Sequence, residues 1–283
     1  MPVPSSPMPI LHAIVLGLVQ GFSEFLPISS SGHLILTRWF FGWETPGDPS
    51  VEKAFDVALH LGTLVAVVAY FRRDLAKYFR EGLRLLWHRE RPIDNDGRIA
   101  WLLLLATVPA ALVGALLESW IDERLGTPVI IGVSLIGFGL LLWWADRKMG
   151  QRTVDEFTTR DALLVGAAQA LALNPGTSRS GITMTAGRWI GFDRDAAARL
   201  SFLMSVPVIA GAVVLKVGKL FVDGVPDGLL APMIVGVITS CLSGWLAVWG
   251  TLRLLRTRSF TPFVIYRVAL GIVVLVVAAA GWR

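Results

Sequence analysis

Apolar residues in this chain gather into ten blocks that are separated by short polar connections. A helix needs about 20 residues to cross a bilayer, with a working range of roughly 17–25. Six blocks approach or reach that length and predict spanning helices, at Phe55–Phe71, Ala100–Leu117, Pro128–Ala145, Leu200–Phe221, Leu230–Gly250 and Pro262–Ala280. No long polar linker divides them, so we expect one all-α polytopic membrane domain over residues 1–283.

The other four blocks are short and form two pairs, Ile10–Leu26 with Ile28–Phe41, and Ala162–Leu173 with Ile182–Ile190. Proline, glycine and serine interrupt each pair, and in series these residues end helices. Non-helical backbone at membrane depth survives only where protein or a water-filled cavity satisfies its polar groups. Each pair therefore predicts a re-entrant helical hairpin.

Loop charge supports this topology. Lysine and arginine concentrate in the connections 72–98, 147–160 and 253–258, whereas the remaining connections are acidic. Basic loops belong in the cytoplasm. Acidic and basic connections fall on opposite sides of the membrane only if each short pair enters and leaves it on one side. The first pair then enters from outside and the second from inside. Both termini are then expected outside.

The same order of segments predicts an internal repeat. Each half is one hairpin followed by three spans, and three is odd, so the second half is inverted relative to the first. Repeat one covers about 10–145 and repeat two about 162–281. Gly17–Gln20 aligns with Gly166–Gln169, and Ser-Gly pairs follow at the same offset. Inverted repeats with broken helices place a polar site near the bilayer midplane.

Composition agrees with a membrane protein. The chain is 54% hydrophobic and 17% charged, against about 25% charged in a soluble domain. Its net charge of +5 sits in a few short loops, so it reflects topology control and predicts no nucleic-acid partner. The single cysteine, Cys241, excludes an intrachain disulfide.

The first break carries groups that can react. Glu24 lies four residues after Gln20, so a helix places both side chains on one face. An ionisable residue inside an apolar hairpin is costly and indicates a functional site, although Glu24 could instead form a structural ion pair. The run Ser29–Ser31 is followed by Gly32 and His33, and a hydroxyl near an imidazole and a carboxylate is the pattern of an activated nucleophile. A serine run at a helix break can also cap the next helix.

The second break carries an anion-binding pattern. Arg179 lies within it, beside Gly176, Ser178 and Ser180. A guanidinium at membrane depth needs an anionic partner, and its planar fork suits phosphate. Backbone N–H groups in a Gly/Ser turn that leads into a helix form an anion site. We expect a phosphate or carboxylate ligand, with an Arg179–Glu24 ion pair as an alternative or additional role.

Together the two breaks fit the hydrolysis of a phosphate ester or anhydride. A divalent cation, Mg or Ca, that bridges Glu24 and the phosphates would suit this chemistry. One carboxylate is too few for a metal cage made by protein alone. We therefore expect substrate phosphates to complete the coordination.

Two long motifs carry a family resemblance. The stretch Gln20–His33 resembles the glutamate/glutamine-rich first motif of the bacterial undecaprenyl-diphosphate phosphatases of the bacitracin-resistance type, and Pro175–Thr183 is similar to their second motif. Segments Phe55–Gly62 and Pro262–Arg267 also fit, so the resemblance covers essentially the whole chain. It implies hydrolysis of undecaprenyl diphosphate to the monophosphate lipid carrier, with roles in peptidoglycan synthesis and bacitracin resistance. It also implies a metal-dependent enzyme of the bacterial plasma membrane whose site faces the periplasm.

Residues and resemblance together assign the expected site. The catalytic group is Glu24, Ser30, His33 and Arg179; the phosphate-binding group is Ser29, Ser31, Gly176, Ser178, Arg179, Ser180 and Thr183; the metal ligands are Glu24 and Gln20. Many family members have glutamate where this chain has Gln20, a poorer metal ligand, which shifts weight to Glu24. Either Ser30 or His33 can be the nucleophile, and His60 receives no role.

A transporter is the main alternative, because paired hairpins in an inverted repeat are also a transporter architecture. The reactive pairing of Ser30 and His33 beside Glu24 favours hydrolysis. A relative of the acid phosphatases that use a Ser-Gly-His element is disfavoured, since no second histidine followed by aspartate comes after Arg179. A protein that only binds a partner is disfavoured, because it would not explain the ionisable residues buried at the two breaks. The expected partners are a polyprenyl diphosphate and the bilayer, and the oligomeric state stays open, with a homodimer as one alternative.

Overall fold

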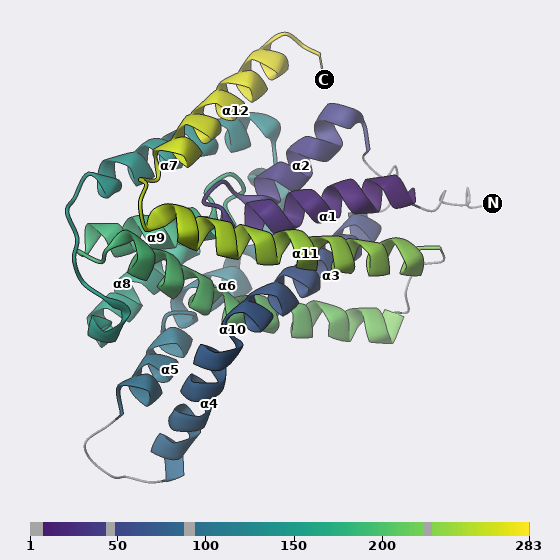
Figure 1. Ribbon diagram of the computed structural model, residues 1–283. Helices are drawn as coiled ribbons and strands as arrows, with labels where there is room; N and C mark the ends of the chain where they lie inside the picture. Colours follow the sequence, from purple (N-terminus) through teal and green to yellow (C-terminus); the bar gives the residue numbers. More distant parts are fainter. Residues whose placement is uncertain (1–7, 44–48, 88–93, 224–227, 283) are drawn as a thin grey trace.

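The computed structural model describes residues 8–43, 49–87, 94–223 and 228–282 (Figure 1). Within these ranges the regular structure is helical and contains no strand. The α-helices are α1 (Ile10–Phe25), α2 (Ser30–Phe41), α3 (Pro49–Tyr70), α4 (Arg72–Trp87), α5 (Asn95–Leu105), α6 (Val108–Arg124), α7 (Pro128–Asp146), α8 (Thr159–Ala170), α9 (Arg179–Trp189), α10 (Arg194–Asp223), α11 (Leu230–Leu255) and α12 (Thr261–Ala279).

Five helical segments among the described residues are long and apolar enough to cross a membrane. They are Asn95–Leu117, Pro128–Asp146, Arg194–Leu215, Leu230–Leu255 and Thr261–Ala279. Helix α3 joins α4 at a bend of 83°, and this pair passes the same test as a sixth segment. The all-helical, multi-pass architecture is therefore confirmed, and these segments overlap the six predicted spans.

The first basic connection differs from its predicted form. Residues 72–98 were expected to be a loop, yet Arg72–Trp87 forms helix α4 and Asn95 begins α5. Basic and apolar residues alternate in α4 at helical spacing, so one face can pack on α5 while the arginines of α4 stay exposed. An excess of basic residues in a connection therefore does not exclude local helix.

The two short helix pairs break where the sequence places the breaks. Helix α1 ends at Phe25 and α2 begins at Ser30; helix α8 and the 3₁₀ turn Leu171–Leu173 precede α9, which begins at Arg179. Helix α2 runs back toward the start of α1 (Figure 1). We call Leu26–Ser29 the first tip and Asn174–Ser178 the second tip.

Small residues let α1 approach α11 closely. A Cβ atom on Gly21 would lie 1.9 Å from Ser243 Oγ and 2.5 Å from the Ser240 carbonyl oxygen. Gly17, one turn earlier, meets the same helix at Thr239. This is the small-xxx-small pattern by which membrane helices bring their backbones together. The contact fixes α1, and with it the residues at its C-terminal end.

Helices of the two halves pack against each other reciprocally. Helix α1 packs on α11, and α8 packs on α6 and α5. Helix α3 contacts α10, and α7 contacts α12. The largest buried apolar cluster includes Phe25, Met184, Phe202 and Val248, so it lies directly behind the two tips. Both tips therefore adjoin this buried apolar cluster.

Candidate active site

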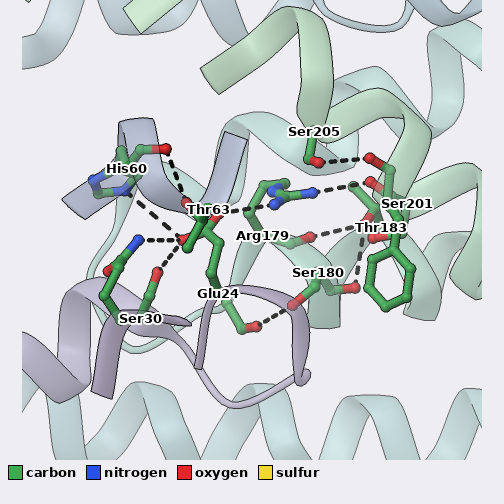
Figure 2. A network of polar contacts seen from close by, with 12 residues as sticks. Glu24, Ser30, His60, Thr63, Arg179, Ser180, Thr183, Ser201 and Ser205 are labelled. Atoms are coloured by element: carbon green, nitrogen blue, oxygen red, sulfur yellow. Dashed lines mark hydrogen bonds and ion pairs between the residues drawn. The ribbon is translucent and has the colours of Figure 1, made fainter. Parts of the chain in front are cut away.

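A buried ion pair joins the two halves at their tips. Glu24, in the last turn of α1, accepts a hydrogen bond at Oε1 from Arg179 Nη2 over 2.8 Å. The side chains are 6% and 13% exposed. Arg179 Nη1 also donates to the Ser201 carbonyl oxygen of α10 at 2.9 Å (Figure 2). The ion pair that the sequence offered as one role of these residues is therefore present.

The other oxygen of Glu24 receives two neutral donors. Ser30 Oγ, at the start of α2, donates to Glu24 Oε2 at 2.6 Å, and Gln20 Nε2 donates to the same atom at 3.0 Å. A hydroxyl bonded to an ionised carboxylate is placed to lose its proton. Gln20 Oε1 is buried and, within the described part of the chain, has no hydrogen-bond partner.

His60 completes this cluster from α3, a position that sequence reasoning left without a role. Its Nε2 atom lies 3.7 Å from Glu24 Oε2 (Figure 2), and its Nδ1 atom lies 2.7 Å from the Asp56 carbonyl oxygen. The imidazole is 34% exposed, in contrast to buried Glu24. The available signal was a histidine inside an apolar span, since ionisable residues there indicate function.

His33 faces a different neighbour. Its Nδ1 atom lies 2.7 Å from the Ser29 carbonyl oxygen and its Nε2 atom 2.7 Å from the Tyr266 hydroxyl of α12. Because a carbonyl only accepts, Nδ1 carries the hydrogen and Nε2 accepts from Tyr266. Among the described residues these are its hydrogen-bond partners, so the structure groups Ser30, and not His33, directly with Glu24.

Most of the polar residues expected to bind phosphate connect the tips. The Gly176 N–H donates to Ser29 Oγ at 3.0 Å, and Ser180 Oγ donates to the Leu26 carbonyl oxygen at 3.0 Å. Ser178 Oγ caps α9 by accepting from the Gly181 N–H at 3.0 Å. The Gly176 and Ser180 contacts therefore hold the second tip and the start of α9 against the first tip.

Thr183 and Ser31 occupy contrasting positions. Thr183 Oγ1 is buried and donates to the Arg179 carbonyl oxygen at 2.8 Å and to Ser201 Oγ at 2.8 Å, so it ties the backbone of the arginine to α10 (Figure 2). Ser31 is exposed on α2. The structure therefore brings Gln20, Glu24, Ser30 and Arg179 together and leaves Ser31 at the surface.

Arg267 of α12 holds both tips and was given no role from the sequence. Its guanidinium donates to the carbonyl oxygens of Pro27 at 3.0 Å, Gly176 at 2.9 Å and Thr177 at 3.0 Å. It is fully buried, and its described partners are carbonyl oxygens only. An arginine in an apolar span was a usable signal, but its target depends on how α12 packs.

The described residues hold no group of three or more histidine, cysteine, aspartate or glutamate side chains that could bind a metal. Glu24 and His60 form a smaller donor pair, and the Gln20 oxygen adds an unpartnered acceptor beside them. A divalent cation at this place would need further ligands from a bound phosphate.

Fold and site define a multi-pass helical membrane protein with a buried carboxylate–guanidinium cluster between two interrupted helix pairs. The family model described as Bacitracin resistance protein BacA matches residues 13–273, and the chain belongs to this bacterial membrane-protein family.

Curated relatives cover nearly the whole chain. A protein of Moorella thermoacetica is 48% identical over 271 residues, which is 95% of this chain and 98% of the relative. One of Geobacter sulfurreducens is 48% identical over 266 residues (93% and 96%), and one of Hahella chejuensis is 45% identical over 261 residues (92% and 95%). All three are named undecaprenyl-diphosphatase.

Proposed function

We propose that this protein hydrolyses undecaprenyl diphosphate to undecaprenyl phosphate and inorganic phosphate. The names of its relatives support the substrate and the reaction. The structural observation that carries the proposal is the shared carboxylate: Glu24 binds the Ser30 hydroxyl through one oxygen and Arg179 through the other. The reaction would recycle the lipid carrier for peptidoglycan synthesis, and the family description supports a role in bacitracin resistance.

Ser30 is the proposed nucleophile. Its Oγ attacks the terminal phosphorus as Glu24 Oε2 takes its proton, and the bond from phosphorus to the bridging oxygen breaks to release the prenyl monophosphate. Water then hydrolyses the phosphoserine and regenerates the hydroxyl. Arg179 offsets the negative charge that develops on the phosphoryl oxygens. The 2.6 Å contact to Glu24 favours Ser30 over His33, whose reactive nitrogen is engaged by Tyr266.

His33 is assigned to the wall of the site. Its ring connects the Ser29 carbonyl oxygen to the Tyr266 hydroxyl, and so ties the first tip to α12. Of the expected phosphate-binding groups, we assign contact with the substrate to Arg179, because it shares the Glu24 carboxylate with Ser30. Ser29, Gly176, Ser178, Ser180 and Thr183 then act by holding the tips in position.

A divalent cation, Mg or Ca, is proposed as cofactor. Glu24 and the buried, unpartnered Gln20 Oε1 would hold it together with oxygens of the substrate diphosphate. When bound, it would offset negative charge on the phosphates during transfer.

The two helix pairs are proposed to be re-entrant hairpins of an inverted repeat. Reciprocal packing supports this: α1 lies on α11 as α8 lies on α6, and α3–α10 and α7–α12 pair across the halves. Ser29 and Ser178 lie at the repeat offset and share positive φ values of 80° and 75°. Loop charge supports termini outside and a site facing the periplasm.

Phosphate release from a polyprenyl diphosphate by the purified protein in detergent tests the function. We expect release with Mg or Ca present and its loss in Glu24→Gln. Detergent removes any membrane gradient, so a transporter would bind the lipid without releasing phosphate. If the folded wild-type protein releases no phosphate, the proposed phosphatase activity is overturned.

A further inference from the structure

A pocket of about 610 Å³ lies where three of the membrane-crossing segments end together. Its lining includes Asp146, the last residue of α7, Arg194, the first residue of α10, and Leu255, the last residue of α11. Each of these residues is also one end of a segment that is long and apolar enough to span a membrane. Such ends lie at the level of the lipid headgroups, just outside the hydrocarbon layer. The pocket therefore adjoins the headgroups of one leaflet.

Basic side chains outnumber acidic ones in this lining, which holds five arginine or lysine residues and three aspartates. Asp146 accepts hydrogen bonds from Arg188 Nε at 3.2 Å and from Arg194 Nε at 2.7 Å. The Phe260 N–H donates to the same carboxylate at 3.2 Å. Two guanidiniums thus share one carboxylate and leave one positive charge in excess. We call this site the basic pocket.

The other two carboxylates of the basic pocket also have donors of their own. Asp195 accepts from Arg199 Nε at 2.6 Å and from Arg256 Nε at 3.4 Å. Asp193 accepts from the Ala196 N–H at 2.7 Å, in the first turn of α10. Since each aspartate is already bonded, the charge left for a ligand is positive.

Arg147 and Lys148 add two exposed cations to the basic pocket. The guanidinium of Arg147 lies 4.1 Å from the centre of the Trp143 ring, and Lys148 Nζ lies 3.5 Å from that of Trp189. Among the described residues neither cation has a carboxylate partner, so their N–H groups are available to an anion. Both indoles are exposed, and tryptophan favours the boundary between hydrocarbon and headgroups. The rings therefore hold the two cations at headgroup depth.

We propose that the basic pocket binds the headgroup of an anionic phospholipid, with Arg147 and Lys148 in contact with its phosphate diester. Basic pockets between membrane helices suit such headgroups, whereas a zwitterionic headgroup brings a cation of its own. Loop charge supports the cytoplasmic leaflet as the source, because Arg147, Lys148 and Arg256 belong to basic connections. The site is separate from the Glu24–Arg179 cluster, and the proposal does not depend on the proposed function.

An apolar wall beside the cations favours a lipid over a soluble phosphate. The rings of Trp144 in α7 and Trp189 in α9 have centroids 4.2 Å apart, and both side chains are exposed. Lys148 Nζ lies over the second of these rings. A headgroup bound at Lys148 can therefore lay its acyl chains against the two indoles, a contact that inorganic phosphate lacks.

Titration of the delipidated full chain in detergent with phosphatidylglycerol tests the site. Native mass spectrometry measures bound lipid, and thermal unfolding measures the rise in Tm that a ligand of the folded state produces. We expect Arg147→Gln/Lys148→Gln to bind phosphatidylglycerol about 10–30-fold more weakly, because each basic side chain near a membrane surface contributes about fivefold. Arg72→Gln/Arg73→Gln is the matched control: it removes two adjacent exposed arginines outside the pocket and should keep the wild-type affinity. Both variants should keep the wild-type Tm without lipid, since the changed side chains are exposed.

Phosphatidylcholine and inorganic phosphate separate the alternatives. Phosphatidylcholine should bind more weakly than phosphatidylglycerol and equally to the wild type and the pocket variant. Equal binding of both lipids by the wild type would indicate nonspecific contact with the bilayer, and equal losses in both double variants would indicate diffuse attraction by surface charge. Either result overturns the proposal. It is also overturned if inorganic phosphate raises the Tm as much as phosphatidylglycerol in the wild type but not in the pocket variant, because the pocket then takes a soluble anion.

Discussion

Arg179 Nη2 lies 2.8 Å from Glu24 Oε1, which joins α9 to α1 across 155 positions of the chain. A guanidinium that pairs with the proposed base and is proposed to bind the substrate phosphate cannot be replaced by a point charge. We expect Arg179→Ala to lower kcat about 10²–10³-fold, and Arg179→Lys to recover little of that loss. Phosphate release from detergent-solubilised protein measures both. The exposed Arg160 provides a matched control, and near-normal turnover of Arg179→Ala would remove the phosphate-clamp role.

The Ser30–Glu24 contact predicts a covalent intermediate. Ser30→Ala should lose the intermediate and nearly all turnover, because no hydroxyl remains beside the carboxylate. His33→Gln should retain a trappable phosphoserine, with turnover lowered by the loss of the Tyr266 contact. Rapid acid quenching with labelled substrate, followed by peptide mapping, identifies the modified residue. Phosphohistidine at position 33 would reverse the assignment, and Ser259→Ala is a control remote from Glu24.

Close packing of α1 on α11 predicts a sharp size limit at Gly21. Gly21→Ala places a methyl group 2.5 Å from the Ser240 carbonyl oxygen, so the helices must separate. Overpacking of this kind costs about 1–3 kcal/mol. Thermal unfolding in detergent should show a lower Tm. Gly250→Ala in α11 is the matched control because nothing lies within 4 Å of its added Cβ; an equal Tm loss in both variants would contradict the packing explanation.

Arg267 predicts a loss of both stability and activity at a residue that does not touch Glu24. Arg267→Met leaves the carbonyl oxygens of Pro27, Gly176 and Thr177 buried without this donor, at about 1–3 kcal/mol for each group that finds no other partner. We expect a lower Tm and, at a temperature where the variant is folded, a lower kcat. Arg258→Ala, at an exposed position, controls for loss of charge. Unchanged kcat in a folded Arg267→Met protein would show that the tips hold without the arginine.

Much of the architecture could be predicted because it depends on local pattern. Apolar length located the spans, and Pro, Gly and Ser located both helix breaks. Glu24 and Arg179 were recognisable as a pair because a buried charge in an apolar hairpin needs an opposite charge. Helix α4 was missed because charge counting ignores the helical spacing of basic residues.

The partners of the histidines could not be predicted from the sequence. Whether His60 or His33 faces Glu24 depends on the rotation of α2 and α3 and on where α12 packs. Those are set by contacts such as Gly62 against Ser240, between residues far apart in the chain. The spacing of residues along one helix does not predict such long-range contacts.

The hydrogen bonds that Arg267 donates to the two tips also bear on the biosynthesis of the protein. A nascent chain that has emerged from the ribosome through α11 already contains Glu24, Ser30, His60 and Arg179, but the carbonyl oxygens of both tips still await α12. Insertion of α12 therefore adds the Arg267 contacts to the two tips last. A chain whose α12 is not yet inserted would contain the reactive groups but would lack the Arg267 contacts to the tips. Full activity is therefore expected only after α12 has inserted.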